Sequence, residues 1–297
     1  MKIAISGSTG LLGERLVSAL TEDGHEVVRM VRRPAQPGEI QWAPGGHLPP
    51  ERLAGIAAVV HLAGEPIGAK RWTDEQRQRI LASRRDGTRT VAQAVAEARD
   101  GPSVLVSASA VGYYGDCGDE LLTEESAPGD DFLADVVAQW EAAADPAREA
   151  GVRVAHPRSG VVLDPGGGAL GRMLPLFKFG LGGRFGSGGQ WWPWVTIDDE
   201  VRALRFALEG DLSGPFNVAA PTPVTNAEFS KTLAAVLHRP AFLPVPRFGP
   251  KLVFGEMADA LLFGSQRVVP ARLVGAGFDF AWPELEPALR HLLKRGS

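Results

Sequence analysis

Short apolar runs alternate with stretches of helical periodicity through the first half of the chain. The apolar runs predict buried strands over residues 2–6, 27–31, 57–62, 104–107 and 152–156. Between them, apolar residues recur every three or four positions, which predicts amphipathic helices over 11–21, 73–98 and 132–150. Strands that alternate with helices favour right-handed crossovers. The pattern therefore predicts an α/β protein with a Rossmann-type, doubly wound parallel sheet.

The pattern loosens after residue 157, where glycines crowd positions 166–171 and 180–189. Helical periodicity returns over 170–179, 198–208, 225–237 and 284–294, and a short strand is expected at 216–218. Capping boxes mark two helix starts, Thr73 with Gln76 and Thr225 with Glu228. These features predict a smaller, mainly helical C-terminal substrate lobe over the carboxyl edge of the sheet. The expected division is a Rossmann domain over 1–165 plus about 195–220, and a lobe over 166–194 and 221–297.

Composition narrows the class of protein and of partner. A net charge of −4 over 297 residues favours a small-molecule substrate over nucleic acid or an anionic membrane. The single cysteine, Cys117, excludes an intrachain disulfide and fits a cytoplasmic protein. No apolar run reaches the roughly 20 residues that span a bilayer. No spacing of His, Cys and Asp predicts a metal site, and we expect Asp198 and Asp199 to cap a helix. The oligomeric state stays open, a homodimer included.

The segment GSTGLLG lies between the first strand and the first helix. Gly7 permits a tight turn, Gly10 lets the backbone approach a pyrophosphate, and Gly13 lets the helix pack close to the strand. The exposed N–H groups and the positive end of the helix then bind the anion. The loop therefore predicts dinucleotide binding by Gly7, Thr9, Gly10, Leu11, Leu12 and Gly13.

The end of the second strand distinguishes between the two nicotinamide cofactors. The sequence there reads MVRRP, which places Arg32 and Arg33 about 20 residues beyond the loop, with no acid beside them. Guanidinium groups offer forked donors that suit a 2′-phosphate. The expected cofactor is NADP(H); the alternative is that both arginines are solvated loop residues.

Three further segments carry recognisable motifs. They are HLAG at 61–64, SASAVGYYG at 107–115 and VTIDDEV at 195–201. Together with the glycine loop they resemble the extended short-chain dehydrogenase/reductase superfamily of the NAD-dependent epimerase/dehydratase type. The glycine-rich stretch around 168–195 and the tail after 244 are similar to an atypical "epimerase family" subgroup. That subgroup has a C-terminal domain of unassigned function and sometimes carries a cell-division inhibitor label. The resemblance implies a dinucleotide cofactor bound also by His61, Leu62, Ala63, Gly64 and Pro157.

The resemblance breaks at the catalytic residues. The superfamily uses a serine, a tyrosine and a lysine in the pattern YxxxK, commonly followed by an acid. If Glu141 is that acid, Val137 and Leu133 stand in place of lysine and tyrosine. General acid–base assistance is worth roughly 10²–10⁴ in rate, so their absence is a serious deficit. Ser109 is the member of the trio that remains, although a serine there also suits a turn.

Two tyrosines offer a replacement for the missing acid. Tyr113 and Tyr114 are the only tyrosines in the chain, and both follow Ser109 at the carboxyl end of a strand, where ligands bind in an open α/β sheet. Either tyrosine needs a neighbouring cation if it is to lose its proton near neutral pH. Lys70, Lys178 and Arg158 are the candidates for that cation. The alternative is that each tyrosine packs under or beside the pocket. The histidines His61 and His156, at strand ends, are expected to be structural.

The stretch GSGGQWWPW predicts a substrate pocket. Flexible glycines followed by Gln190, Trp191, Trp192 and Trp194 suit a lid for a planar or apolar substrate, although core packing of at least one tryptophan is also expected. The overall hypothesis is an NADP(H)-dependent oxidoreductase or epimerase-like enzyme that acts on a carbonyl or alcohol. The rival is a catalytically weak or inactive NADPH-binding sensor or regulatory protein.

Overall fold

The computed structural model describes residues 1–241, 244–248, 252 and 255–294, and within them the predicted parallel sheet is confirmed. Its strands run in the order β3-β2-β1-β4-β5-β8-β12, and β6 pairs with the end of β8; every pairing is parallel. The bounds are β1 Lys2–Ser6, β2 Glu26–Val31, β3 Ile40–Gln41, β4 Ala58–His61, β5 Val104–Ser107, β6 Ser109–Ala110, β8 Arg153–Ser159 and β12 Gly214–Val218. The strand order reverses between β1 and β4, so a ligand-binding crevice is expected at their carboxyl ends.

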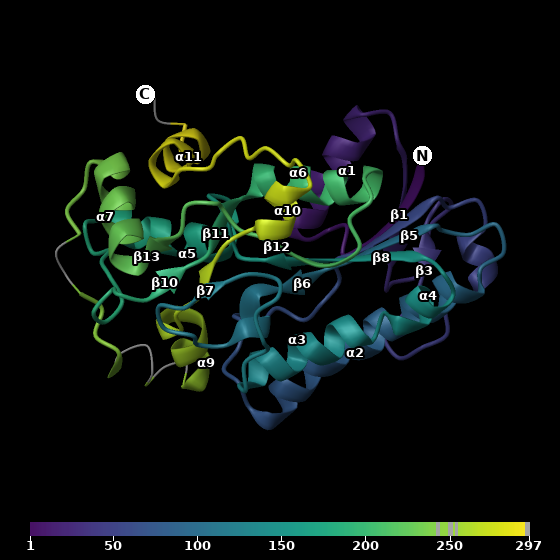
Figure 1. Ribbon diagram of the computed structural model, residues 1–297, viewed down its shortest axis with the longest axis horizontal. Helices are drawn as coiled ribbons and strands as arrows, with labels where there is room; N and C mark the ends of the chain where they lie inside the picture. Colours follow the sequence, from purple (N-terminus) through teal and green to yellow (C-terminus); the bar gives the residue numbers. More distant parts are fainter. Residues whose placement is uncertain (242–243, 249–251, 253–254, 295–297) are drawn as a thin grey trace.

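Helices cover both faces of the sheet (Figure 1). One face carries α2 (Asp74–Glu97), α3 (Phe132–Ala142) and α4 (Asp145–Glu149); the other carries α1 (Leu11–Glu22) and α6 (Ile197–Glu209), with α10 (Ala271–Gly275) beside β12. Alternate residues of β1 divide between the two cores: Ile3 and Ile5 pack with Leu16 of α1, whereas Ala4 packs with Val91 of α2. This alternation follows from the period of two in a strand.

Two details of the helices differ from the prediction. The helix expected over 132–150 is divided, because α3 ends at Ala142 and α4 begins at Asp145 with Pro146 in its first turn. Proline is tolerated at that position but not in a helix interior. The Thr73 hydroxyl caps α2 by accepting from the Gln76 N–H, but the Gln76 side chain donates to Glu65 and not back to Thr73. The second capping box, Thr225 with Glu228, is confirmed.

The second half of the chain, together with residues 121–122, adds helices and short ladders of two or three residue pairs at one end of the sheet (Figure 1). The helices are α5 (Gly168–Lys178), α7 (Asn226–Leu237), α9 (Glu256–Ala258) and α11 (Leu285–Leu292). The ladders pair β10 (Trp191–Trp192) with β13 (Val224–Thr225), β11 (Trp194–Thr196) with β9 (Val161–Asp164), and β14 (Arg267–Val268) with β7 (Leu121–Leu122). Short one-turn elements are η1 Pro50–Leu53, η2 Val111–Tyr114 and η3 Asp259–Phe263. Residues 242–243, 249–251, 253–254 and 295–297 of the predicted lobe lie outside the described residues.

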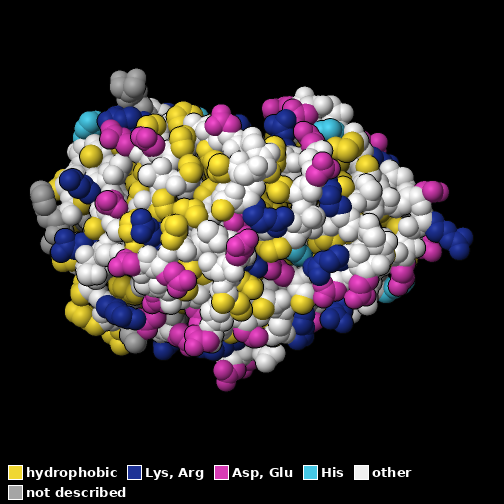
Figure 2. All heavy atoms as spheres, viewed as in Figure 1, with side chains coloured by type: hydrophobic (Ala, Val, Ile, Leu, Met, Phe, Trp, Pro, Cys, Tyr) yellow, Lys and Arg dark blue, Asp and Glu magenta, His cyan; other side chains and the backbone are white. Residues whose placement is uncertain are grey.

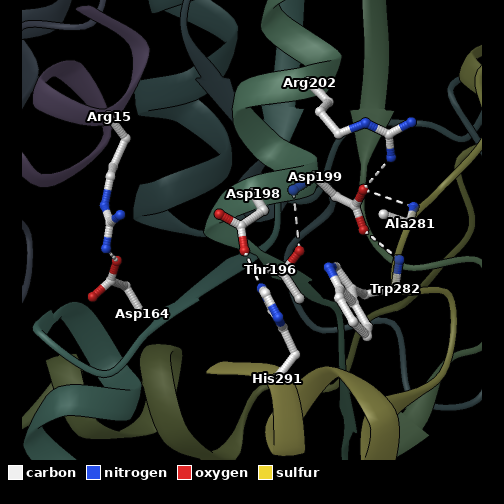
Figure 3. A network of polar contacts seen from close by, with 9 residues as sticks. All are labelled: Arg15, Asp164, Thr196, Asp198, Asp199, Arg202, Ala281, Trp282 and His291. Atoms are coloured by element: carbon white, nitrogen blue, oxygen red, sulfur yellow. Dashed lines mark hydrogen bonds and ion pairs between the residues drawn. The ribbon is translucent and has the colours of Figure 1, made fainter. Parts of the chain in front are cut away.

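Asp199 fastens the C-terminal segment to the first turn of α6 (Figure 3). Its fully buried carboxylate accepts the backbone N–H groups of Ala281 and Trp282, both at 2.9 Å, and pairs with Arg202. The N-cap of α6 is Thr196, so the prediction that the acids of this segment cap the helix is wrong. A charge-assisted hydrogen bond is stronger than a neutral one, so Asp199 serves as an anchor between distant parts of the chain.

Further contacts in Figure 3 reinforce this anchor. Asp198 pairs with His291 of α11 at 2.7 Å, and the His291 ring stacks on Trp282. On the other side, Arg15 of α1 pairs with the buried Asp164 at 3.3 Å. The Asp198–His291 pair thus ties α11 to α6, and the Arg15–Asp164 pair ties α1 to β9.

Charged side chains of both signs are interspersed over the face drawn in Figure 2, with apolar atoms between them. Among the described residues, no helix has the length and hydrophobicity needed to cross a bilayer.

A carboxyl group lies buried inside the α6 face of the sheet. Glu200 is fully buried, and the Ser159 hydroxyl donates to its Oε1 at 2.5 Å, whereas Oε2 has no partner among the described residues. Burial raises the pKa of Glu200 from its ordinary value of 4.5 to about 7. Because the folded state holds this proton more tightly than the unfolded chain, Glu200 makes stability fall as the pH rises through 7.

Replacing Glu200 with glutamine tests this assignment. The wild-type free energy of unfolding should decline between about pH 4.5 and pH 7, by about 3 kcal/mol for a shift of this size. Glu200→Gln does not titrate, so its stability relative to wild type should rise by up to about 3 kcal/mol from pH 5 to pH 8. Urea denaturation at the two pH values measures the change. Glu209→Gln, at the exposed end of α6, is the control. If the stability difference between Glu200→Gln and wild type were the same at both pH values, the raised pKa of Glu200 would be refuted.

Candidate cofactor and active site

The glycine turn between β1 and α1 is held in close contact with the end of β4. Gly7 has a φ of +69°, and a Cβ there would lie 2.8 Å from the nitrogen of Ala63 and from the carbonyl carbon of Leu62. A Cβ on Gly13 would lie 2.2 Å from the carbonyl oxygen of Gly7. Both positions therefore require glycine on steric grounds.

The same turn leaves the start of α1 open to a ligand. Gly10 is the N-cap, and no side chain caps the helix. Thr9, Gly10 and Leu11 are exposed, and Leu12 is half-buried. Uncapped N–H groups at a helix start bind anions through hydrogen bonding and the helix dipole. The geometry thus fits a diphosphate at this turn.

The strand-end residues of HLAG divide between the crevice and the core. Gly64 is exposed, and Leu62 and Ala63 are half-buried beside Gly7. The His61 side chain is fully buried, with Nδ1 2.7 Å from the Ser6 hydroxyl, and burial lowers its pKa to about 4. His61 therefore faces a ligand only through its backbone, as the resemblance implies. Pro157 is likewise buried within β8, in register with Phe216 of β12.

The two arginines after β2 have different environments. Arg33 donates to both carboxylate oxygens of Glu39, at 2.6 Å each, and the backbone N–H of Gln36 donates to the same carboxylate. The guanidinium of Arg33 holds the pKa of Glu39 at about 2. The expectation of no acid beside the arginines is therefore wrong: Glu39, six residues further on, occupies the fork of Arg33. Arg32 is exposed and has no ion-pair partner in the described part of the chain.

Ser109 belongs to a hydrogen-bonded network that crosses from the sheet to α3. Its hydroxyl lies 2.6 Å from Glu141 Oε1 and donates to it. Arg158 of β8 pairs with both oxygens of Glu141, from Nε and Nη2, at 2.8 Å. Burial opposes ionisation of Glu141, but the Arg158 guanidinium outweighs it and lowers the pKa of the carboxyl. Glu141 is therefore a charged acceptor at neutral pH.

Tyr114 and Tyr113 both contact Arg158, but differently. Tyr114 is fully buried; its hydroxyl donates to Asn217 at 2.7 Å and accepts from Arg158 at 3.1 Å. Burial raises the pKa of Tyr114, which makes loss of its proton harder. These contacts favour a structural role and disagree with Tyr114 as a proton donor. Tyr113 is half-buried, and the guanidinium carbon of Arg158 lies 3.5 Å from the centre of its ring.

Among the three cations that were candidates to assist a tyrosine, Arg158 is the one beside the pair. Lys70 and Lys178 are exposed. A cation over the ring face stabilises the ring electrostatically, but its charge is already balanced by Glu141. The arrangement fixes the Tyr113 ring in place.

Apolar side chains fill the positions where the resemblance would place tyrosine and lysine. Val137 is buried and Leu133 half-buried, and both lie close to Gly112 of the tyrosine turn. Leu133 also packs in a cluster with Met257 and Leu261 of the C-terminal segment. The α3 side of the cleft therefore presents hydrocarbon and no titratable group at these two positions.

Of the three tryptophans in the stretch, only Trp191 is partly exposed. Trp192 and Trp194 are buried in the core of the C-terminal lobe, with Phe229 against Trp192, which corrects the prediction that they form a lid. Trp191 is half-buried; its indole N–H donates to Asp119, and Arg267 lies over its ring at 4.6 Å.

Gln190 faces an open depression beside Trp191. Its amide nitrogen donates to the carbonyls of Phe185 and Leu262. The depression has a volume of about 310 Å³ and is lined by residues of the segments 116–119 and 185–190 and by Arg247, Phe263 and Ser265. Gln190 is therefore engaged in holding the wall of the depression.

Residues of the C-terminal segment complete the tyrosine turn. The Gln266 amide donates to the carbonyls of Val111 and Gly115, at either end of η2. The Ser265 hydroxyl donates to Gly118, and its backbone carbonyl accepts from Cys117. Sequence reasoning missed both residues, because about 150 positions separate them from the turn and no spacing signal connects the two. It also missed Glu39, although an acid near paired arginines was a visible signal.

These features define a Rossmann-type α/β protein with a glycine turn suited to a dinucleotide. The sequence over residues 3–219 matches the NAD dependent epimerase/dehydratase family, and residues 245–292 match a domain of unknown function, DUF1731. The chain belongs to the NAD dependent epimerase/dehydratase family, and the resemblance inferred from its motifs is confirmed.

Full-length relatives carry the same two parts. An epimerase family protein of Mycobacterium bovis is 44% identical over 296 residues, covering 99% of this chain and 98% of the relative. The human epimerase family protein SDR39U1 is 38% identical over 301 residues, covering 99% of this chain and all of the human protein.

Two solved structures extend the comparison to the fold. A crystal structure of human SDR39U1 with NADPH superposes with a TM-score of 0.90 at 38% identity, over 99% of both chains. A nucleoside-diphosphate sugar epimerase from Corynebacterium glutamicum gives a TM-score of 0.82 at 39% identity, over 99% of this chain and 58% of that one.

The pairing of Arg33 with Glu39 generates a prediction about cofactor choice. Glu39 uses the donors that a 2′-phosphate would need and adds a negative charge beside it. Glu39→Gln should therefore tighten NADPH binding by about tenfold, because it removes a negative charge from beside the phosphate and releases the donors of Arg33. NADH binding should change little or weaken. Fluorescence titration with both nucleotides measures this, with Glu51→Gln as the control. Weaker NADPH binding by Glu39→Gln would contradict competition.

Proposed function

We propose that this chain is an NADP(H)-dependent oxidoreductase or epimerase-like enzyme of the atypical extended short-chain dehydrogenase/reductase type. The observation that carries the proposal is the open start of α1, held against the end of β4 by Gly7 and Gly13. A Cβ on Gly10 would meet only the Gly7 carbonyl oxygen within 4 Å, at 3.4 Å, so the turn is open to a diphosphate at this residue. The crystal structure of the 38% identical human relative contains NADPH, which supports the same cofactor here.

Cofactor contacts follow from this placement. The N–H groups of residues 9–13 would bind the diphosphate, and the backbone of Leu62, Ala63 and Gly64 would border the adenine-side ribose. Arg32 is the free guanidinium for the 2′-phosphate, since Arg33 is paired with Glu39. Bound NADP(H) would supply or accept the hydride.

Ser109 and Glu141 suit a substrate that bears a hydroxyl group. The Ser109 proton is committed to Glu141, so its oxygen presents lone pairs and accepts a hydrogen bond. An alcohol O–H is such a donor, whereas a carbonyl oxygen is not. When the alcohol is oxidised, its proton would pass to Ser109 Oγ while the serine proton moves to Glu141. Tyr113, beside Arg158, would border the reacting carbon; the half-buried Trp191 favours a substrate with a flat or apolar part.

A second function is favoured by the α3 side of the cleft. Leu133 and Val137 offer no proton, and Tyr114 is buried with both sides of its hydroxyl engaged. These observations suit a protein that binds NADPH as a sensor or regulator without turnover.

The cofactor assignment predicts unequal losses in an arginine variant. Arg32→Ala combined with Arg33→Ala should weaken NADPH binding by about tenfold to a hundredfold, because each lost phosphate contact is worth about 1–3 kcal/mol. NADH, which lacks the 2′-phosphate, should bind almost as before. Calorimetry with both nucleotides measures the losses. Equal losses would refute the phosphate role, and no heat from wild-type protein with either nucleotide would refute the whole proposal.

Turnover separates the enzyme from the sensor. Purified protein would be mixed with NADP⁺ and a panel of alcohols, and with NADPH and the matching carbonyl compounds, and absorbance followed at 340 nm. If the chain is an enzyme, the absorbance at 340 nm should change only when a substrate is present. Ser109→Ala should then lower kcat by about 10²–10⁴. Tyr113→Phe and Tyr114→Phe test the tyrosines in the same assay; equal rates in both would eliminate a phenolic acid. Tight NADPH binding with no change across the panel would favour the sensor.

A further inference from the structure

Arg84 of α2 lies directly beneath the exposed strand-end glycine of the candidate cofactor site. Its guanidinium carbon is 3.4 Å from the place where a Cβ on Gly64 would stand, and its two terminal nitrogens are within 3.6 Å of that place. Nη1 donates to the carbonyls of Glu65 and Ile80, at 3.0 and 3.2 Å. The cation is therefore fixed under the loop that follows β4.

The charge of Arg84 is less neutralised than the charges of Arg158 and Arg33. Arg158 and Arg33 each form a two-point ion pair with a carboxylate. Arg84 is half-buried and has no carboxylate within hydrogen-bonding distance in the described residues; the Glu65 carboxylate acts on it only at longer range and accepts from Gln76. Removing a cation from water without a close counterion is costly. An anionic ligand above Gly64 would offset that cost.

The phosphate-binding turn is close to this cation. Gly7 touches Leu62 and Ala63, and Gly64 is the next residue, about 3.8 Å further along the backbone. The guanidinium therefore lies within about 10 Å of the turn, close enough for an appreciable Coulomb attraction across protein. Desolvation lowers the pKa of Arg84 to about 10, so it remains protonated at neutral pH.

Arg84 also approaches the part of α3 where Val137 stands in place of the lysine that the resemblance implies. The guanidinium lies 5.0 Å from the ring centre of Trp140, which is one helical turn beyond Val137. Val137 is the position at which the resemblance would place a lysine. Arg84 thus brings a positive charge from α2 to a region where α3 supplies none at that position.

We propose that Arg84 is a further cofactor-binding residue, whose buried charge attracts the diphosphate of the dinucleotide through the Gly64 backbone. The inference rests on the proposed function, because it requires a nicotinamide dinucleotide in the crevice. The diphosphate is common to NADH and NADPH, so Arg84 strengthens the binding of both equally. It differs in this from Arg32, which acts on the 2′-phosphate alone.

The test compares neutral and charged replacements of Arg84. Arg84→Gln should raise the Kd for NADPH and for NADH by the same factor, about tenfold for one cation acting across about 10 Å. Arg84→Lys, which keeps the charge, should restore most of the affinity. Arg89→Gln, on the exposed face of the same helix, should bind both nucleotides as wild type does. Nucleotide fluorescence gives the Kd values, and thermal unfolding checks the fold.

Each outcome decides between readings. Wild-type binding with unchanged Kd values in Arg84→Gln would overturn the inference while leaving the proposed function intact. Equal losses in Arg84→Gln and Arg84→Lys would overturn it too, because the effect would then be one of shape. Failure of the wild-type protein to bind either nucleotide would refute the proposed function itself. Arg84→Met, which keeps the apolar stem, replaces the glutamine variant if that variant does not fold.

Discussion

The contact between the β1–α1 turn and the end of β4 is the constraint on which the rest of the site depends. Gly7 cannot carry a Cβ because Leu62 and Ala63 lie against it, and Gly13 cannot because the Gly7 carbonyl does. This close backbone approach brings the start of α1 and the strand end to one crevice. The start of α1 has no side-chain cap, so its N–H donors are unsatisfied and favour an anion. Glycine is required at the same turn for a different reason, the close backbone contacts.

The distribution of carboxylates among the arginines determines what each arginine can do. Glu141 neutralises Arg158, and the pair holds Ser109 and the tyrosine turn in position. Glu39 occupies Arg33 and leaves Arg32 exposed to solvent. Arg84 donates from Nη1 to two carbonyl oxygens, which engage one of its nitrogens but do not balance its charge. These four arginines therefore differ in their capacity to bind an anionic ligand.

The helices were predictable because each buries one face, and the central strands because they bury both; Val104–Ser107 was placed to the residue. The short ladders were not predictable, because two or three residues carry no period. The glycine loop was recognisable since its sterics are local. The tryptophans were predicted only in part: core packing of at least one was expected and is confirmed, but which of them face the core depends on α7, which packs against Trp192 and Trp194 only in three dimensions.

The residues that match the domain of unknown function are structurally part of the candidate site and not an appendage. Gln266 holds both ends of the turn that carries the tyrosines, and Asp199 holds the backbone of Ala281 and Trp282. Hydrogen bonds to buried backbone groups are costly to leave unmade. Removal of the C-terminal segment would therefore leave the carbonyls of Val111 and Gly115 without the Gln266 amide, and the Asp199 carboxylate with Arg202 but without its two backbone donors. The tyrosine turn and the C-terminal segment thus specify each other's position.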